Sequence, residues 1–347
     1  MIHESALGAM KRSIRNSTTR CRRFHHTPPF RRPAIQPVES APSSPARADI
    51  DAFRQNAFLL ERPYHFKNDG VASSGELPAA SKWFSPGVNH EKSSVFSSHM
   101  DEFMDWPFPF ELISAPSAGT PPVVAFRDWL SKSPNLTDQI LAGILQATTA
   151  DLESRSFFQL HAPLKLLAKA LEFNQELQKQ NLPPILLYIA QSSLSDLPEP
   201  LRKDLPTPQL VQQAGKGDIY NSSIWLGTEP TYTPLHRDPN PNLFCQLCSQ
   251  KVVRLLPPEL GDRVFFEVQV QLRQQASSRI RTTEMMEGAE RAVLHEAVWE
   301  DEKLEDKLQE AELDVGDALF IPNGWWHSVK SVGSQGHLNG SVNWWFR

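Results

Sequence analysis

The run Thr231-Tyr-Thr-Pro-Leu-His-Arg-Asp-Pro-Asn240 places an imidazole and a carboxylate two residues apart, at His236 and Asp238. On an extended strand, side chains two residues apart leave the same face, so both can bind one ion. The best candidate for the third ligand is His327. It ends the run Gly316-Asp-Ala-Leu-Phe-Ile-Pro-Asn-Gly-Trp-Trp-His327, in which a turn, a strand and a second turn would place the imidazole at the mouth of a barrel. Two imidazoles and one carboxylate on one octahedral face suit the iron(II) of an oxygenase, because three positions stay open.

The ligand set alone leaves the reaction open. A zinc hydrolase also uses two histidines and one carboxylate. An isolated His-x-Asp occurs often by chance, and His327 after two tryptophans is also interpretable as a packed structural residue. The order of the three residues, each in a strand and turn context, is what predicts a shared metal.

The elements that position these residues are predicted from apolar periodicity. A spacing near 3.6 from residue 124 to residue 180 predicts two or three helices. Helices followed by short strands, without regular alternation, predict an α+β fold with a barrel or jelly roll. The predicted strands are 57–63, 185–188, 223–226, 243–247, 252–256, 264–270, 318–321 and 340–346.

The chain divides into three parts by composition. Residues 1 to 48 hold nine Lys or Arg against two acids, with a Pro- and Ser-rich linker from 28 to 45. The composition of this arm predicts a mitochondrial presequence and hence a location in the mitochondrial matrix. The alternative is a disordered basic arm or a nuclear-import patch, in a protein of the cytosol or nucleus. Residues 49–184 are predicted as a mainly helical extension and residues 185–347 as the catalytic core. The acidic stretch at about 284–314 is expected to be a solvated helical insertion, with a partner-binding surface as the other interpretation.

Several classes of protein are disfavoured. The longest apolar runs are far shorter than the roughly 20 residues of a membrane-spanning helix. Residues 49–347 hold 26 basic and 38 acidic residues, a poor composition for binding nucleic acid. Cys245 and Cys248 have the spacing of a redox or zinc motif, but strand alternation would direct them to opposite faces, so we expect buried core residues.

The sequence as a whole resembles the JmjC oxygenases, within them most closely the small cupin-type hydroxylases such as the asparaginyl hydroxylase that inhibits the hypoxia-inducible factor. The resemblance covers roughly residues 185 to 347 and implies a double-stranded β-helix that uses iron(II), 2-oxoglutarate and dioxygen. The segments that carry it are Thr233-Pro-Leu-His236-Arg-Asp238, Asn242-Leu-Phe-Cys-Gln-Leu-Cys-Ser-Gln-Lys251, Pro257-Pro258, Gly316-Asp317, Ile321-Pro322, Trp325-Trp326-His327 and Val342-Asn343-Trp344.

The resemblance also implies a cosubstrate pocket. The ketoacid end of 2-oxoglutarate binds the iron, and its distal carboxylate lies deeper, where it needs a cation and hydroxyl donors. The implied cation is Lys251, with Thr233 and Tyr188 as hydroxyl donors. Asn242 and Asn343 match positions that steady the iron-bound carboxylate. From the residues alone, Tyr188 is an ordinary half-buried strand aromatic, and either asparagine can cap a turn.

The implied activity is hydroxylation of a protein side chain with release of succinate and carbon dioxide, by a monomer with no catalytic residue beyond the metal ligands. A transfer-RNA base hydroxylase and a histone lysine demethylase are alternatives with the same chemistry. The acidic body disfavours the first, and the second would usually bring chromatin-reading modules. A catalytically silent cupin-type binding module is the alternative of another class, which the retained ligands, Lys251 and Thr233 disfavour.

Overall fold

The computed structural model describes residues 35–41, 45–70, 77–87, 90–114, 119–152, 155–273 and 288–347. Most of the predicted basic arm, residues 1–34 and 42–44, lies outside the described residues. Residues Ala34–Arg347 form one compact unit. Every helix in the described ranges is too short or too polar to cross a bilayer.

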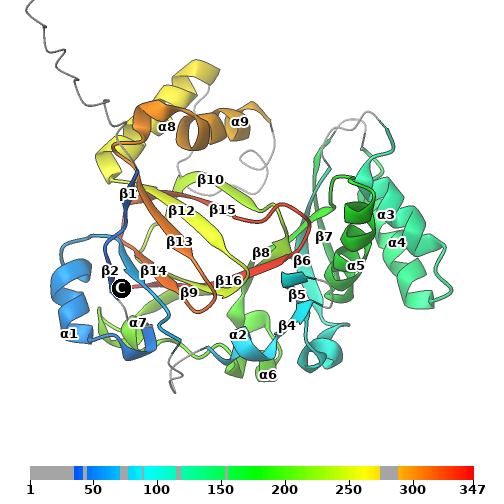
Figure 1. Cartoon of the computed structure of the whole chain (residues 1–347), viewed down its shortest axis with the longest axis horizontal. Helices are drawn as coiled ribbons and strands as arrows, with labels where there is room; N and C mark the ends of the chain where they lie inside the picture. The colour runs from blue at the N-terminus through cyan, green and yellow to red at the C-terminus, as the bar shows by residue number, and fades with distance from the viewer. Residues whose placement is uncertain are drawn as a thin grey trace, which may run out of the picture. The chain divides into compact units, whose positions relative to one another are not determined.

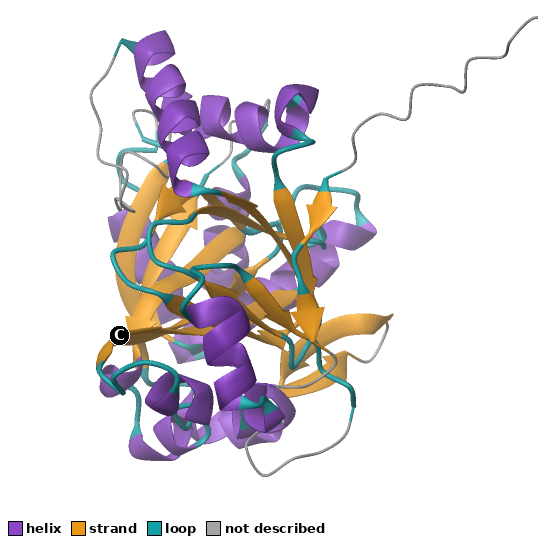
Figure 2. Ribbon diagram, turned by 90° about the vertical axis from the view of Figure 1, so that its left-hand side faces the viewer, coloured by secondary structure: helices purple, strands orange, loops and turns teal. Residues whose placement is uncertain are grey.

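Eight strands of the second half of the chain form a jelly roll of two facing sheets (Figures 1 and 2). The strand order is β13-β12-β15-β10 in one sheet and β14-β11-β16-β9 in the other. This arrangement confirms the predicted α+β fold with a double-stranded β-helix. The strands are β9 (Ile219–Thr228), β10 (Tyr232–Arg237), β11 (Asn242–Cys248), β12 (Lys251–Leu256), β13 (Gln309–Leu313), β14 (Ala318–Ile321), β15 (Trp326–Ser331) and β16 (Leu338–Phe346).

Strands outside the jelly roll widen both sheets. β1 pairs with β13, while β2 and β3 extend one edge of the second sheet and β8, β6 and β7 extend its other edge. The predicted mainly helical extension, residues 49–184, therefore also contains strands β3 to β7. β4 and β5 form a separate two-stranded sheet. The bounds of the eight strands are β1 (Gln36–Pro37), β2 (Ser40–Ala41), β3 (Tyr64–Phe66), β4 (Phe84–Gly87), β5 (His90–Phe96), β6 (Pro107–Ile113), β7 (Phe157–Pro163) and β8 (Leu186–Ser193).

Helices cover the outer faces of the sheets (Figure 1). α8 and α9 pack on the sheet with β12 and β15 through an apolar layer that includes Phe265, Leu294 and Trp326. Within the described residues, the acidic insertion predicted at about 284–314 is helical over Ala289–His295, Glu296–Glu300 and Glu302–Leu304. Its last part is not helical but forms strand β13. The helices are α1 (Ile50–Phe53), α2 (Pro78–Lys82), α3 (Pro122–Ser131), α4 (Leu136–Thr148), α5 (Lys165–Lys179), α6 (Glu199–Lys203), α7 (Gln209–Gln213), α8 (Pro258–Leu272) and α9 (Ala289–His295).

The barrel interior is defined by strand register. Val253 of β12 lies opposite Val329 of β15, and both belong to an apolar cluster with Phe244 of β11. Residues opposite one another in an antiparallel pair share a face, and alternate residues follow on that face. Lys251 and His327, each two residues from a member of this pair, therefore also face the interior.

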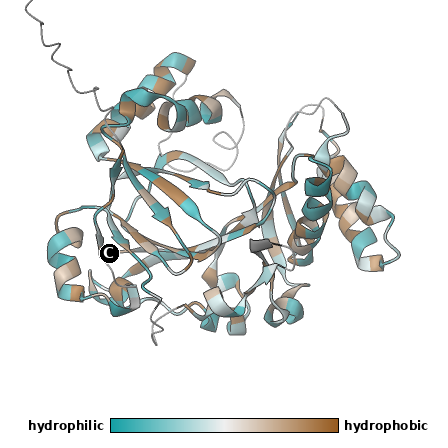
Figure 3. Cartoon of the chain, viewed as in Figure 1, coloured by the Kyte–Doolittle hydropathy of each residue, from teal (hydrophilic) through white to brown (hydrophobic). Residues whose placement is uncertain are grey.

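Two predicted strands are wrong. The apolar run 264–270 belongs to helix α8, where Val264, Phe265 and Val268 are buried at helical spacing while Phe266 is 67% exposed and Val270 59% exposed. Figure 3 shows hydrophilic and hydrophobic residues side by side along α8. The β-branched and aromatic composition favoured a strand, but packing decided the outcome. The strand predicted at 57–63 is also wrong: a helical turn occupies Arg54–Phe58, and strand β3 begins only at Tyr64.

A glycine lets α8 lie directly on the barrel. A Cβ atom at Gly261 would collide with the ring of Trp326, the residue before the predicted ligand His327.

We expect Gly261→Ala to lower the free energy of unfolding by about 1–3 kcal/mol through overpacking, measured by urea denaturation. The control is Gly143→Ala in α4, where a Cβ atom would meet nothing within 4 Å, so the substitution should stabilise by up to about 1 kcal/mol. Equal effects at the two positions would contradict this packing.

Candidate metal centre and cosubstrate pocket

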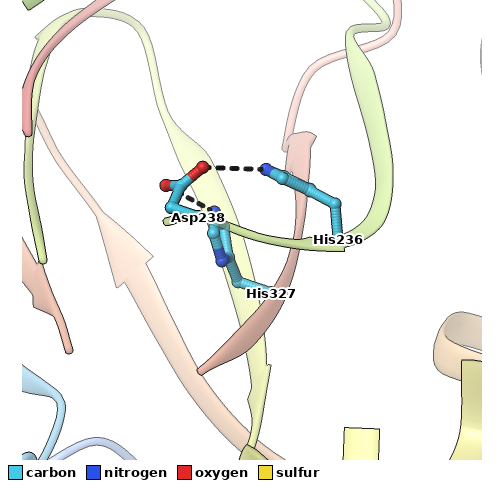
Figure 4. A group of neighbouring side chains, drawn as sticks. All are labelled: His236, Asp238 and His327. Carbon is cyan, nitrogen blue, oxygen red and sulfur yellow. Dashed lines mark ion pairs between the residues drawn. The ribbon is translucent and has the colours of Figure 1, made fainter. Parts of the chain in front are cut away.

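The three predicted metal ligands converge at one end of the barrel (Figure 4). β10 and β15 pair antiparallel with His236 directly opposite His327, and Asp238 follows the last residue of β10. The ligand atoms lie within 4.8 Å of one another. The Asp238 carboxylate lies 4.0 Å from Nε2 of His236 and 3.6 Å from Nε2 of His327.

The backbone orients both imidazoles. Nδ1 of His236 lies 2.8 Å from the carbonyl oxygen of Pro234, and Nδ1 of His327 lies 3.3 Å from that of Trp325. A carbonyl only accepts hydrogen bonds, so each Nδ1 donates and each Nε2 keeps its lone pair for a metal. A shift in the β10–β15 register between Thr233 and His236 brings the imidazole of His236 to the interior face.

Burial favours the neutral imidazole that metal binding needs. His236 and His327 are each 3% exposed. Burial first, and then the neighbouring His327, lower the pKa of His236 well below its ordinary value. An imidazole that is neutral at physiological pH does not have to lose a proton before it binds a cation.

Asn242 and Asn343 form a chain of amides behind the carboxylate. Nδ2 of Asn242 donates to Oδ2 of Asp238 at 3.0 Å, and Nδ2 of Asn343 donates to Oδ1 of Asn242 at 3.0 Å. Their predicted contact with an iron-bound carboxylate of the cosubstrate stays a prediction. The structure instead gives Asn242 a direct role in orienting the protein's own carboxylate.

Lys251 is buried in the barrel and 2% exposed. Its ammonium donates to Oγ of Ser341 at 2.8 Å and to the hydroxyl of Tyr188 at 3.3 Å. The structure thus brings two of the three residues predicted for the distal carboxylate together. Sequence reasoning missed Ser341. Strand alternation from Asn343 could have found it, because residues two apart share a face.

Thr233 does not join this group. It lies opposite Val329, so its side chain shares the interior face, and its carbonyl oxygen accepts a hydrogen bond from Oγ of Ser328 at 2.9 Å. Within the described residues, no hydrogen bond links its hydroxyl to Lys251. Its role in binding a carboxylate therefore stays a prediction.

Unpaired polar atoms test whether the barrel fits a polar ligand. Oγ of Ser223, Nε1 of Trp225, Nε1 of Trp345 and Oδ1 of Asn343 are buried without a hydrogen-bond partner in the described part of the chain. Asn343 of β16 lies opposite the interior residue Phe244 on one side and opposite Ser223 of β9 on the other. Trp345 and Trp225 lie two residues along the same strands, so all four side chains face the barrel interior. Most buried polar groups are paired in folded proteins. Three unpaired donors on the interior face that also holds the buried ammonium fit an anionic ligand with several acceptor oxygens, such as a dicarboxylate.

The two cysteines of β11 are buried, free and part of one apolar cluster. The expectation that they are core residues is confirmed, but the expectation that they face opposite ways is wrong. A register irregularity between Gln246 and Cys248 inserts an extra residue and returns Cys248 to the face of Cys245. Burial raises the pKa of Cys248 to about 12, so this thiol stays protonated.

Comparison with known proteins identifies the family. The model of the cupin-like domain matches residues 121–347, so the chain belongs to the cupin-like domain family. Its relatives are JmjC proteins, which confirms the resemblance to that group.

Three relatives illustrate the range of similarity. Lysine-specific demethylase JMJ30 of Arabidopsis thaliana is 28% identical over 46% of this chain and 33% of its own length. Lysine-specific demethylase 8 of Danio rerio is 28% identical over 46% and 36%. The bifunctional peptidase and (3S)-lysyl hydroxylase JMJD7 of Homo sapiens is 28% identical over 47% and 54%. The matched region spans only about a third of the first two.

The geometry predicts how metal affinity depends on Asp238 and Asn242. Asp238→Ala removes a ligand and should abolish stoichiometric binding of Mn(II), a stand-in for iron(II), in an electron paramagnetic resonance titration. Asn242→Ala leaves the carboxylate of Asp238 in place but removes its hydrogen-bond donor, so we expect the affinity for Mn(II) to fall by about 10- to 100-fold.

The matched control is Asn135→Ala, which removes the side-chain cap at the start of α4 and touches no predicted ligand. It should cost stability without changing the affinity for Mn(II). Unchanged Mn(II) affinity in Asp238→Ala would refute the assignment of the ligands.

Proposed function

We propose that this chain is an iron(II)- and 2-oxoglutarate-dependent dioxygenase that hydroxylates a protein side chain. The observation that carries the proposal is the joint placement, on one barrel interior, of the triad His236, Asp238 and His327 and the buried Lys251. The residue opposite Lys251 on β15 is Ser331, which lies four residues beyond His327. The positions of Lys251 and His327 are therefore separated by about 13 Å along the strand direction. This spacing favours a ligand with two separated anionic ends over a single carboxylate.

Each protein group has a defined task in this proposal. The triad would hold the iron, and Asn242 orients the carboxylate of Asp238 through its hydrogen bond. Lys251, Ser341 and Tyr188 hold the distal carboxylate of the cosubstrate. When bound, iron(II), 2-oxoglutarate and dioxygen supply oxidising chemistry that ends in succinate, carbon dioxide and a hydroxylated product. The protein selects which substrate carbon lies near the metal and excludes competing reactions.

The names of the relatives support a protein substrate. The human relative is named as a lysyl hydroxylase, and the Arabidopsis and zebrafish relatives as lysine-specific demethylases. Demethylation begins with the same oxidation of a C–H bond, so it is the second candidate outcome for this site. The acidic body disfavours a transfer-RNA substrate.

We also propose that the protein acts in the mitochondrial matrix, on the basis of the basic, Ser- and Thr-rich arm before residue 49. Sequencing the amino terminus of the protein isolated from cells tests this location. A new end within residues 11–48 supports it, and an intact end at Met1 or Met10 contradicts it.

Turnover tests the metal assignment. Purified protein supplied with iron(II), 2-oxoglutarate and a protein extract from its own cells should release succinate and add 16 daltons to a target protein. His236→Ala and Asp238→Ala should reduce both signals to background, because each removes a metal ligand. Succinate assays and mass spectrometry measure the outcome, with Asn135→Ala as the folded control. Full turnover in either ligand variant would disprove the assignment.

The affinity for 2-oxoglutarate tests Lys251 separately. A hydrogen bond to a charged group contributes about 1.5–3 kcal/mol, so Lys251→Ala should raise the Michaelis constant for 2-oxoglutarate by about 10- to 150-fold. Lys303→Ala is the control, because that ammonium is exposed and its ion pair within the described residues is with Asp301. A Michaelis constant equal to that of the unmodified protein would remove Lys251 from the pocket.

A further inference from the structure

Glu229 is a buried carboxylate that the metal centre does not use. It directly follows β9 and is 1% exposed. Its Oε1 accepts hydrogen bonds from Oγ of Ser249 at 2.7 Å and from Nδ2 of Asn339 at 2.9 Å. A Cβ atom at Gly333 would collide with its Oε2, so a glycine makes room for the carboxylate. Two hydrogen bonds and the space left by one glycine therefore fix this buried carboxylate.

The partners of Glu229 place it one layer below Lys251. Ser249 lies two residues before Lys251, and Asn339 lies two residues before Ser341, the serine that Lys251 contacts. Gly333 lies two residues beyond Ser331, which is opposite Lys251 on β15. Glu229 is thus farther from the metal ligands than Lys251 is. Any ligand that reaches from the metal to Lys251 meets the ammonium before the carboxylate.

Lys251 needs a negative charge nearby. Its hydrogen-bond partners are two neutral hydroxyls, and no ion pair to it exists among the described residues. Burial lowers the pKa of Lys251 to about 7, and the charge of Glu229 is the main effect that raises it. Cys248 and Tyr188, which also lie near Lys251, stay neutral at physiological pH because burial raises the pKa of both groups. Glu111 acts on Tyr188 rather than on Lys251.

We propose that Glu229 is a positioning residue that keeps Lys251 in its ammonium form and so sets the pH range in which the barrel binds a dicarboxylate. The ligand class rests on the proposed function above, whereas the pairing of Glu229 with Lys251 does not. Because Glu229 lies behind Lys251, its attraction for the ammonium exceeds its repulsion of the ligand. It therefore favours binding at neutral and alkaline pH, despite having the same charge sign as the ligand.

The direction of the pH dependence follows from proton linkage. Above the pKa of Lys251, the lysine must gain a proton before it pairs with a carboxylate, so affinity falls about tenfold for each pH unit. Glu229→Gln removes the nearby charge and lowers this pKa. The fall in affinity then begins at lower pH, and the variant binds about tenfold more weakly at pH 8 for each unit of that shift. As the pH falls below the lower pKa of the variant, Lys251 becomes protonated in both proteins and the difference in affinity shrinks.

Calorimetry measures this effect without turnover. 2-Oxoglutarate is titrated into the Mn(II)-loaded full chain between pH 6 and pH 8.5, for the unmodified protein, Glu229→Gln and the charge-retaining Glu229→Asp. Glu312→Gln is the matched control, because that carboxylate is exposed on β13 of the same barrel. We expect a shifted profile for Glu229→Gln alone. Superimposable profiles for Glu229→Gln and the unmodified protein would overturn the proposal.

A second measurement needs no ligand. The pKa of Lys251 is followed by nuclear magnetic resonance of labelled lysine side chains in the free protein, with Lys251→Met to assign the signal. A lower pKa in Glu229→Gln supports the pairing, and an unchanged pKa overturns it. If the unmodified protein does not bind 2-oxoglutarate, the proposed function fails, yet this titration still decides the role of Glu229.

A folding failure of Glu229→Gln is also informative. The double variant with Lys251→Met removes the ammonium that Glu229→Gln leaves buried without a counter-charge. Regained folding in the double variant supports the pairing, because the cost then came from the unpaired lysine. Continued unfolding shows that Glu229 acts through Ser249 and Asn339 alone and overturns the proposal.

Discussion

The antiparallel pairing of β10 with β15 is the constraint on which the site depends. It brings two histidines that are 91 positions apart in the sequence to directly opposite places on one ladder. Opposite residues on an antiparallel ladder share a face, so a register shift of one residue would turn one imidazole out of the barrel. The Trp326 ring, packed against α8 at Gly261, holds the start of β15 in place. The arrangement of the three candidate metal ligands therefore depends on both strand register and helix docking.

The barrel interior combines an apolar half with a polar half. The apolar cluster around Phe244, Val253 and Val329 gives the two sheets a common core. The polar half contains an ammonium, several hydroxyls and unpaired donors that a purely structural core would not retain, since each unpaired buried group costs about 1–3 kcal/mol. Such a cost is typical of a functional site rather than of a scaffold. The unpaired groups therefore favour a barrel that binds a polar ligand over a purely structural barrel.

How far the sequence predicts this structure depends on the range of the interactions. His236, Asp238 and His327 were predicted because their spacing and turns are local patterns, and the barrel followed from short strands. The strand proposed at 264–270 failed because only docking on Trp326 reveals that its apolar residues follow a helical spacing. The predicted orientation of the Cys248 side chain was wrong because a β-bulge depends on pairing with the partner strand. Ser341 and Glu229 required knowledge of register between distant strands, which no local pattern contains.

The pocket is not a property of the jelly roll alone. Tyr188 reaches Lys251 from β8, which joins the barrel to the strands of the first half of the chain. Its neighbour on β9 is Gly227, where a Cβ atom would collide with the Tyr188 ring, so the ring crosses the strand only because a glycine is there. On its other side Tyr188 lies opposite Glu111 of β6. The strands of the extension thus continue the sheet that lines the site, so the position of Tyr188 in the pocket depends on β6 as well as on the jelly roll.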